Sequence, residues 1–155
     1  MIQRAPVAGR TSMPPARQEF PRSFAALEAI HAFVVAHLPV RDARGAVGYA
    51  VFMAIEELFT NMVKYNPVGT GLIRIELALE GGMVACHVID PDSERFDPTA
   101  AAEVDIDRPV AERQPGGLGL QLVKRMVDSL SYDYTGRRST ISFVRRLSDP
   151  VPKMR

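Results

Sequence analysis

The sequence is poor in cysteine and aromatic residues and carries almost no net charge. Its 155 residues include one cysteine, Cys86, and no tryptophan. A single cysteine excludes a disulfide framework and a cysteine-rich metal site. Nineteen basic and eighteen acidic residues give a net charge of +1, which argues against a dedicated nucleic-acid surface. The length and a hydrophobic content of 46% predict one domain that folds without cross-links.

Signals for secretion, membrane insertion and a P-loop are also missing. The first six residues, Met1 to Pro6, lack the apolar core of a signal peptide. We expect no membrane-spanning segment and a cytoplasmic protein. The sequence has no Gly-x-x-x-x-Gly-Lys-Ser/Thr run, which excludes the P-loop type of phosphate site.

Proline and arginine are concentrated near the N-terminus. Residues 1–22 contain four prolines and four arginines but few core-forming side chains. We expect a flexible arm over residues 1–19 that contributes an edge strand, with partner binding as its alternative use. The folded domain is expected at residues 20–148 and a C-terminal tail at 149–155.

Hydrophobic spacing predicts a mixture of helices and strands. The expected elements are helices at 24–38, 42–65 and 118–130 and strands at 71–79, 83–89, 131–134 and 139–147. A long irregular stretch separates the second strand from the third helix, as is typical of a lid or a binding loop. This order indicates an α+β fold: a two-layer α/β sandwich with helices on one face of a mixed, mostly antiparallel sheet.

The longest expected helix carries a stripe of polar side chains. At about 100° per residue, Glu57, Asn61 and Lys64 fall within about 60° of one another. A carboxylate, an amide and an ammonium on one stripe can act as a base, a metal ligand and a phosphate contact. The solvent-exposed face of an amphipathic helix has the same appearance, so the stripe alone leaves both interpretations open.

Two further patterns flank the irregular stretch. Asp90 follows an expected strand, where a carboxylate can recognise a ligand; a turn formed by Asp90-Pro91-Asp92 is the alternative. Gly116, Gly117 and Gly119 stand at the start of a helix, where free backbone amides form an anion site. Glycine turns open many helices, so this pattern by itself has little specificity.

Taken together, Glu57-x-x-x-Asn61, Asp90 after a strand and the glycines at a helix start resemble the Bergerat ATP-binding module. This nucleotide domain is shared by gyrase, histidine kinases and mismatch-repair ATPases. Within that superfamily the chain looks like the stand-alone anti-sigma factor serine kinases, because Arg95-Phe-Asp-Pro98 and the run that follows Gly116 match that subgroup. The resemblance covers about residues 20–147 and implies the Bergerat fold.

The resemblance implies a role for each matching residue. Glu57 corresponds to the catalytic carboxylate that activates a hydroxyl or water, Asn61 to the magnesium ligand and Lys64 to a phosphate contact. Asp90 corresponds to the aspartate that accepts the adenine amino group. The other implied nucleotide-binding residues are Phe96, Gly116, Gly117, Leu118, Gly119 and Leu120. ATP and Mg²⁺ are the implied cofactors, and residues 99–115 are the implied ATP lid.

Three positions depart from the family pattern. The family has Asp-x-Gly after the strand, whereas this chain has Asp90-Pro91-Asp92, and its run to Phe96 is longer than usual. The adenine ligand is therefore open between Asp90 and Asp92, with Asp90 favoured because it follows the strand directly. Tyr65 stands where the serine kinases often have histidine, and the final strand lacks the asparagine that often follows its turn.

The resemblance implies a serine/threonine kinase that phosphorylates a STAS-type anti-sigma factor antagonist and sequesters a sigma factor. Homodimers are common among such proteins. Two alternatives remain: a nucleotide-dependent protein-binding module without kinase activity, and a detached histidine kinase catalytic domain. Lys64-Tyr65 favours the last, but His31 and His37 lack the sequence context of a phosphoacceptor.

Overall fold

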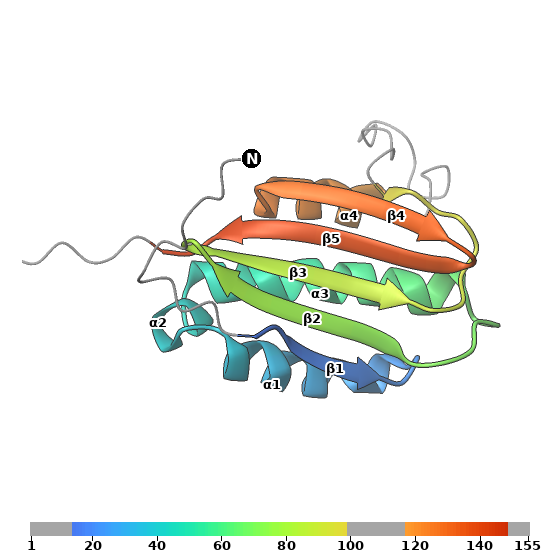
Figure 1. Cartoon of the computed structure of the whole chain (residues 1–155), viewed down its shortest axis with the longest axis horizontal. Helices are drawn as coiled ribbons and strands as arrows, with labels where there is room; N and C mark the ends of the chain where they lie inside the picture. Colours follow the sequence, from blue (N-terminus) through green and yellow to red (C-terminus); the bar gives the residue numbers. More distant parts are fainter. Residues whose placement is uncertain (1–13, 99–116, 149–155) are drawn as a thin grey trace, which may run out of the picture.

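The computed structural model describes residues 14–98 and 117–148. Its strands are β1 (Ala16–Phe20), β2 (Ile73–Glu80), β3 (Met83–Asp90), β4 (Ser129–Thr135) and β5 (Arg138–Arg146). Its helices are the 3₁₀-helix η1 (Phe24–Ala26), α1 (Leu27–His37), α2 (Val40–Ala43), α3 (Ala46–Tyr65) and α4 (Gly117–Met126). The strands form one sheet in the order β1-β2-β3-β5-β4, and each neighbouring pair is antiparallel. The helices α1, α3 and α4 lie on one side of this sheet (Figure 1).

Alternating residues of the central strands fill the space between the sheet and the helices. Ile75 on β2 lies opposite Val88 on β3, Leu77 lies opposite Cys86, and all four are at most 3% exposed. Successive side chains of a strand point to opposite faces, so this alternation makes one face of the sheet apolar. The helices cover that face.

The helix α3 is the central helix of the second layer. Its buried apolar stripe includes Val51, Ile55, Leu58, Phe59 and Met62. By length and composition alone this helix could cross a membrane, but 56% of its apolar window is buried inside the protein. Such burial is typical of the core helix of a folded domain.

The predicted α+β sandwich is confirmed, and the sheet contains no parallel pair within the described residues. The single helix predicted at 42–65 is wrong, because the chain turns at Arg44 and Gly45 between α2 and α3. At this turn Gly48 packs against the carbonyl oxygens of Asp42 and Ala43, each 2.6 Å from where a Cβ would lie. The short helix α2 and the first turn of the long helix α3 thus pack closely as two separate helices.

The helix predicted at 118–130 is wrong at its end. α4 stops at Met126, and the amide of Asp128 donates to the carbonyl oxygen of Val144 at 2.7 Å, which begins the pairing of β4 with β5. Leu130 then lies opposite Phe143 in the sheet. Near the N-terminus, the edge strand expected from the arm is present as β1, at Ala16–Phe20. The stretch 99–115, predicted as a lid, lies outside the described residues.

Candidate functional site

A cavity of about 280 Å³ opens between α3, the segment after β3, the start of α4 and β5. Its apolar lining includes Leu58, Met62, Leu120 and Ile141, and its polar lining includes Asn61, Asn66, Asp90, Ser93 and Ser139. An apolar cavity with a few converging polar groups is the usual form of a small-molecule site. Asn61 and Asp90, predicted as site residues from separate parts of the sequence, line the same cavity.

Glu57 and Asn61 lie one turn apart on α3. Asn61 is 7% exposed, and its amide Nδ2 donates to Glu57 Oε1 at 3.3 Å. This hydrogen bond leaves the amide oxygen of Asn61 as the atom available to a ligand. Glu57 itself is not among the residues that line the cavity.

The carboxylate of Glu57 instead packs against the backbone of Gly119 on α4. A Cβ at position 119 would overlap the carboxylate group of Glu57. The residue spacing gave no sign of this contact, which joins the helix that carries Glu57 to the helix that follows the glycine run. It shows that the absence of a side chain at Gly119 makes room for the carboxylate.

Lys64 lies apart from the cavity. It is exposed near the end of α3 and does not line the cavity. Tyr65, the next residue, does line it, and its ring centroid lies 6.4 Å from that of Phe96. Burial, with a smaller contribution from the negative charge of Glu57, raises the pKa of Tyr65. Tyr65 and Phe96 thus place aromatic surface at the mouth of the cavity.

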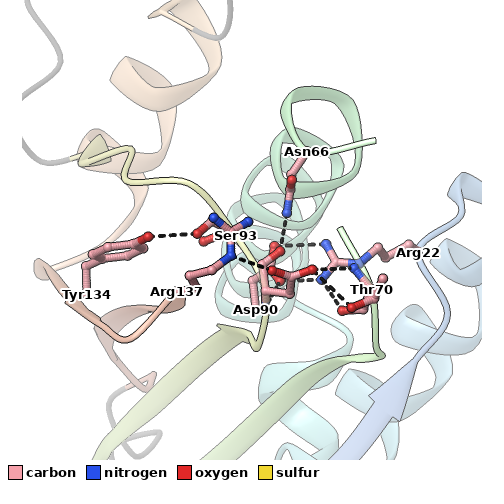
Figure 2. A network of polar contacts seen from close by, with 8 residues as sticks. Arg22, Asn66, Thr70, Asp90, Ser93, Tyr134 and Arg137 are labelled. Atoms are coloured by element: carbon pink, nitrogen blue, oxygen red, sulfur yellow. Dashed lines mark hydrogen bonds and ion pairs between the residues drawn. The ribbon is translucent and has the colours of Figure 1, made fainter. Parts of the chain in front are cut away.

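Asp90 is fully buried and is paired with Arg22, a residue that the sequence did not indicate. Arg22 Nη1 donates to Asp90 Oδ2 at 2.9 Å, Nη2 donates to Oδ1, and Nη2 also donates to the carbonyl oxygen of Thr70 at 3.0 Å (Figure 2). Arg22 follows β1 and lies 68 positions before Asp90. Its only sequence signal was an arginine placed between an edge strand and the first helix.

Asp92 is held by a second arginine and does not line the cavity. Arg137 Nε donates to Asp92 Oδ1 at 2.7 Å, and the amide and hydroxyl of Thr70 donate to Oδ2 at 2.9 and 3.0 Å. The hydrogen bond from Arg137, followed by those from Thr70, lowers the pKa of Asp92 from 3.8 to about 2. Of the two candidate adenine ligands, the structure therefore brings Asp90 and not Asp92 to the cavity.

Ser93 lines the cavity with its backbone fixed on both sides. Its amide donates to the carbonyl oxygen of Arg137 at 2.7 Å, and its carbonyl oxygen accepts from the hydroxyl of Tyr134 at 2.9 Å (Figure 2). Its Oγ is covered and has no hydrogen-bond partner in the part of the chain that the structure describes. A buried hydroxyl without a partner is costly, so Ser93 is a candidate contact for a ligand in the cavity.

The glycine run lies partly within the described residues. α4 begins at Gly117 within the described residues, and the first turn of a helix is where backbone amides bind anions. Leu120, predicted as a nucleotide contact, is 1% exposed and lines the cavity. Gly116 lies outside the described residues, and the side chain of Leu118 is not described.

The fold and the cavity together define a class of protein. An antiparallel sheet backed by helices, with a cavity between a long helix and a strand end, has the architecture expected of a Bergerat-type nucleotide-binding domain. The chain belongs to the histidine kinase-like ATPase domain family, whose sequence model matches residues 20–145. The resemblance stated from the sequence is confirmed at this level, and membership implies an ATP site.

A curated protein and a solved structure are among those similar to this chain. The serine/threonine-protein kinase BtrW of Bordetella bronchiseptica is 28% identical over 99 residues, which are 62% of this chain and 69% of BtrW. The crystal structure of the RsbU and RsbW domains of Rv1364c from Mycobacterium tuberculosis matches with a TM-score of 0.61 and 19% identity. That match covers 89% of this chain, which spans 33% of the mycobacterial chain. At this identity the structural match shows the fold alone.

Proposed function

We propose that this chain is an ATP-dependent serine/threonine protein kinase of the anti-sigma factor type. The observation that carries the proposal is that Asn61 and Asp90 line one cavity, with Glu57 hydrogen-bonded to Asn61 one turn away. The similarity to BtrW, itself a serine/threonine-protein kinase, supports the choice of reaction. The proposal separates into an adenine end, a phosphate end and a transfer step.

Asp90 forms the adenine end of the proposed site. A buried carboxylate at the wall of an apolar cavity accepts the exocyclic amino group of adenine, while Leu58, Met62 and Ile141 contact the base. Guanine carries an oxygen at the same ring position, and a carboxylate repels it. This arrangement favours ATP over GTP.

Asn61 forms the phosphate end, and its chemistry fits Mg²⁺. The hydrogen bond from its Nδ2 to Glu57 leaves an amide oxygen, a hard donor of the type that Mg²⁺ prefers. No group of three His, Cys, Asp or Glu side chains suited to a metal exists among the described residues, so phosphates and water would complete the coordination. When bound, the ion neutralises phosphate charge. The amides at the start of α4 and Lys64 are proposed to contribute further phosphate contacts.

Glu57 is the proposed general base for transfer. The carboxylate takes the proton of the substrate serine hydroxyl as its oxygen forms a bond to the γ-phosphorus. The bond from that phosphorus to the β–γ bridging oxygen breaks, and ADP leaves with the electron pair. Phosphoryl transfer depends mainly on positioning and charge neutralisation, which the residues around the cavity would supply.

The proposed substrate is a serine of a STAS-type antagonist, and the proposed binding partner is a sigma factor. In this scheme the kinase holds the sigma factor until unphosphorylated antagonist displaces it. A homodimer and a cytoplasmic location belong to the same proposal. This class of partner is the one that the sequence resemblance to the anti-sigma factor serine kinases implies.

One observation favours a second candidate, a nucleotide-dependent binding module without transfer. Glu57 lies outside the cavity lining and packs against Gly119, and Lys64 is exposed and outside the lining as well. A domain with these two residues away from the phosphates could bind ATP and control a protein interface without catalysis.

The test combines nucleotide binding with transfer. ATP affinity is measured by titration with and without Mg²⁺, and γ-labelled ATP is then incubated with the chain and candidate STAS or histidine-bearing partners. The kinase proposal expects Mg²⁺-dependent binding that Asn61→Ala abolishes, and label on a partner serine. Binding without transfer favours the module, label on histidine favours a histidine kinase, and unchanged Mg·ATP affinity in a folded Asn61→Ala protein contradicts the site.

A further inference from the structure

The carboxylate of Asp90 and the guanidinium of Arg22 form a pair that is removed from water. The side chain of Asp90 is 0% exposed and that of Arg22 is 11% exposed. We infer that Arg22 is a positioning residue of the nucleotide site, which fixes the orientation of the Asp90 carboxylate and presents its one remaining acceptor position to the amino group of adenine. The inference rests on the proposed function, because it concerns the ligand of Asp90.

Counting the acceptor positions of Asp90 leaves one free. An ionised carboxylate offers about four lone-pair positions. Oδ1 accepts from Arg22 Nη2 and from the amide of Asp92, the latter at 3.0 Å, while Oδ2 accepts from Arg22 Nη1 at 2.9 Å. Within the described residues one position on Oδ2 therefore stays open. An exocyclic amine supplies one N–H that matches it.

The fork of the Arg22 guanidinium decides which part of Asp90 a ligand can reach. Its two nitrogens occupy one acceptor position on each carboxylate oxygen, so a ligand amine must approach the free position on Oδ2. The planar, two-pronged guanidinium also fixes the rotation of the carboxylate, which a single ammonium does less well.

The anchoring of Arg22 extends beyond the carboxylate. Its Nη2 donates to the carbonyl oxygen of Thr70, in the loop before β2. Only Pro21 separates Arg22 from the end of β1. The end of the edge strand, the Thr70 loop and the end of β3 thus meet at one guanidinium (Figure 2). The orientation of Asp90 depends on all three segments.

The experiment compares ATP with purine riboside triphosphate, which lacks the 6-amino group. Wild-type protein should bind ATP at least about tenfold more tightly than the analogue, the scale of one hydrogen bond to a charged acceptor. Arg22→Gln should reduce this ratio to about one while changing the affinity for the analogue by less than about threefold. Arg22→Lys, which keeps the charge but not the fork, should give an intermediate ratio.

Arg74→Gln is the matched control. Arg74 lies on β2 near the same edge of the sheet, forms ion pairs with Glu19 and Glu76 at 3.4 and 3.7 Å, and should keep the wild-type ratio. An equal loss of affinity for ATP and for the analogue in Arg22→Gln and Arg22→Lys would show a merely structural role and overturn the inference. If the wild-type protein binds ATP and the analogue equally well, the inference is overturned but the proposal that the cavity binds a nucleotide is not. No binding of either nucleotide to the wild type would overturn the proposed function as well.

Discussion

Each aspartate of Asp90-Pro91-Asp92 is held by its own arginine. Arg22 pairs with Asp90, and Arg137, from the turn between β4 and β5, pairs with Asp92. The family pattern implied by the resemblance has glycine where this chain has Asp92. At the level of single residues, two ion pairs and the hydrogen bond from Asp92 N to Asp90 Oδ1 fix this segment.

Glu57 separates the kinase from the binding module. Glutamine keeps the size of the side chain but cannot take a proton, so Glu57→Gln should leave ATP affinity within a few-fold. Phosphoryl transfer should fall by roughly 10²-fold or more, the usual effect of losing an acid–base group. The measurement is the initial rate of label transfer at saturating ATP.

The neighbouring Glu56 supplies the control for this substitution. It points about 100° away around the helix, and Glu56→Gln should transfer phosphate at the wild-type rate. If wild-type protein transfers phosphate and Glu57→Gln does so equally fast, Glu57 is only a polar residue of α3 and the general base must be sought elsewhere.

At the scale of elements, the contact between α3 and α4 couples the proposed base to the proposed phosphate-binding helix. Gly119→Ala would place a methyl group where the Glu57 carboxylate lies. Because the displaced group is the end of a flexible side chain, we expect little loss of stability, and alanine favours the helix over glycine by about 0.8–1 kcal/mol. Thermal unfolding should therefore change little while transfer falls to the level of Glu57→Gln.

The double variant tests whether this effect acts through Glu57. Gly119→Ala in the Glu57→Gln background should cause no further loss of transfer, because residues that act as a unit are not additive. Full transfer by Gly119→Ala alone would show that the carboxylate need not occupy its present position.

The pair Asp92–Arg137 links the segment after β3 to the β4–β5 turn and predicts acid sensitivity. Arg137 has a φ of 65°, and its guanidinium holds the pKa of Asp92 at about 2, below the ordinary 3.8. Because folding lowers this pKa, the pair stabilises the fold above about pH 4 and loses that contribution as the pH falls toward about 2. The difference in melting temperature between wild type and Arg137→Gln should narrow over this range; a constant difference would contradict the coupling.

The sequence predicted elements better than it predicted their ends. Periodicity located α1, α3 and the four strands of the two hairpins, because side-chain alternation and burial agree there. It missed the break at Gly45, which depends on the close packing of Gly48 against Asp42 and Ala43, and the end of α4 at Met126, which depends on the pairing of Asp128 with Val144. Helix propensities describe residues one at a time and carry no information about such contacts.

The same limit applied to the site. Asn61 was predicted as a site residue from the polar stripe of its helix and Asp90 from its place at a strand end, and both line the cavity. Arg22 could not be found, because its pairing with a residue 68 positions away exists only once β1 has joined β2. Gly119 was predicted as a nucleotide contact. Its packing against Glu57 could not be predicted, because that contact depends on how α3 and α4 pack together.

At the scale of the whole molecule, Cys86 reports on the opening of the entire core. It is 0% exposed on β3, between the sheet and the helices, and it is the single cysteine of the chain. Burial, with a smaller contribution from Glu76, raises the pKa of the Cys86 thiol. A thiol reagent needs an exposed thiolate, so labelling of the native protein should require unfolding of the sheet–helix interface.

Nucleotide binding should therefore slow the labelling of Cys86, although the thiol does not line the cavity. A ligand that binds only the folded protein stabilises it by about 2.7 kcal/mol at a concentration of about 100 times its Kd. Where reclosing is faster than the chemical step, Mg·ATP at that concentration should slow labelling by about 100-fold. Asn61→Ala should label at the same rate with or without the nucleotide, because its metal ligand is gone. If Mg·ATP does not change the rate of Cys86 labelling in the wild-type protein, either β3 opens without disturbing the cavity or the cavity does not bind ATP. A direct titration of ATP binding separates these two outcomes.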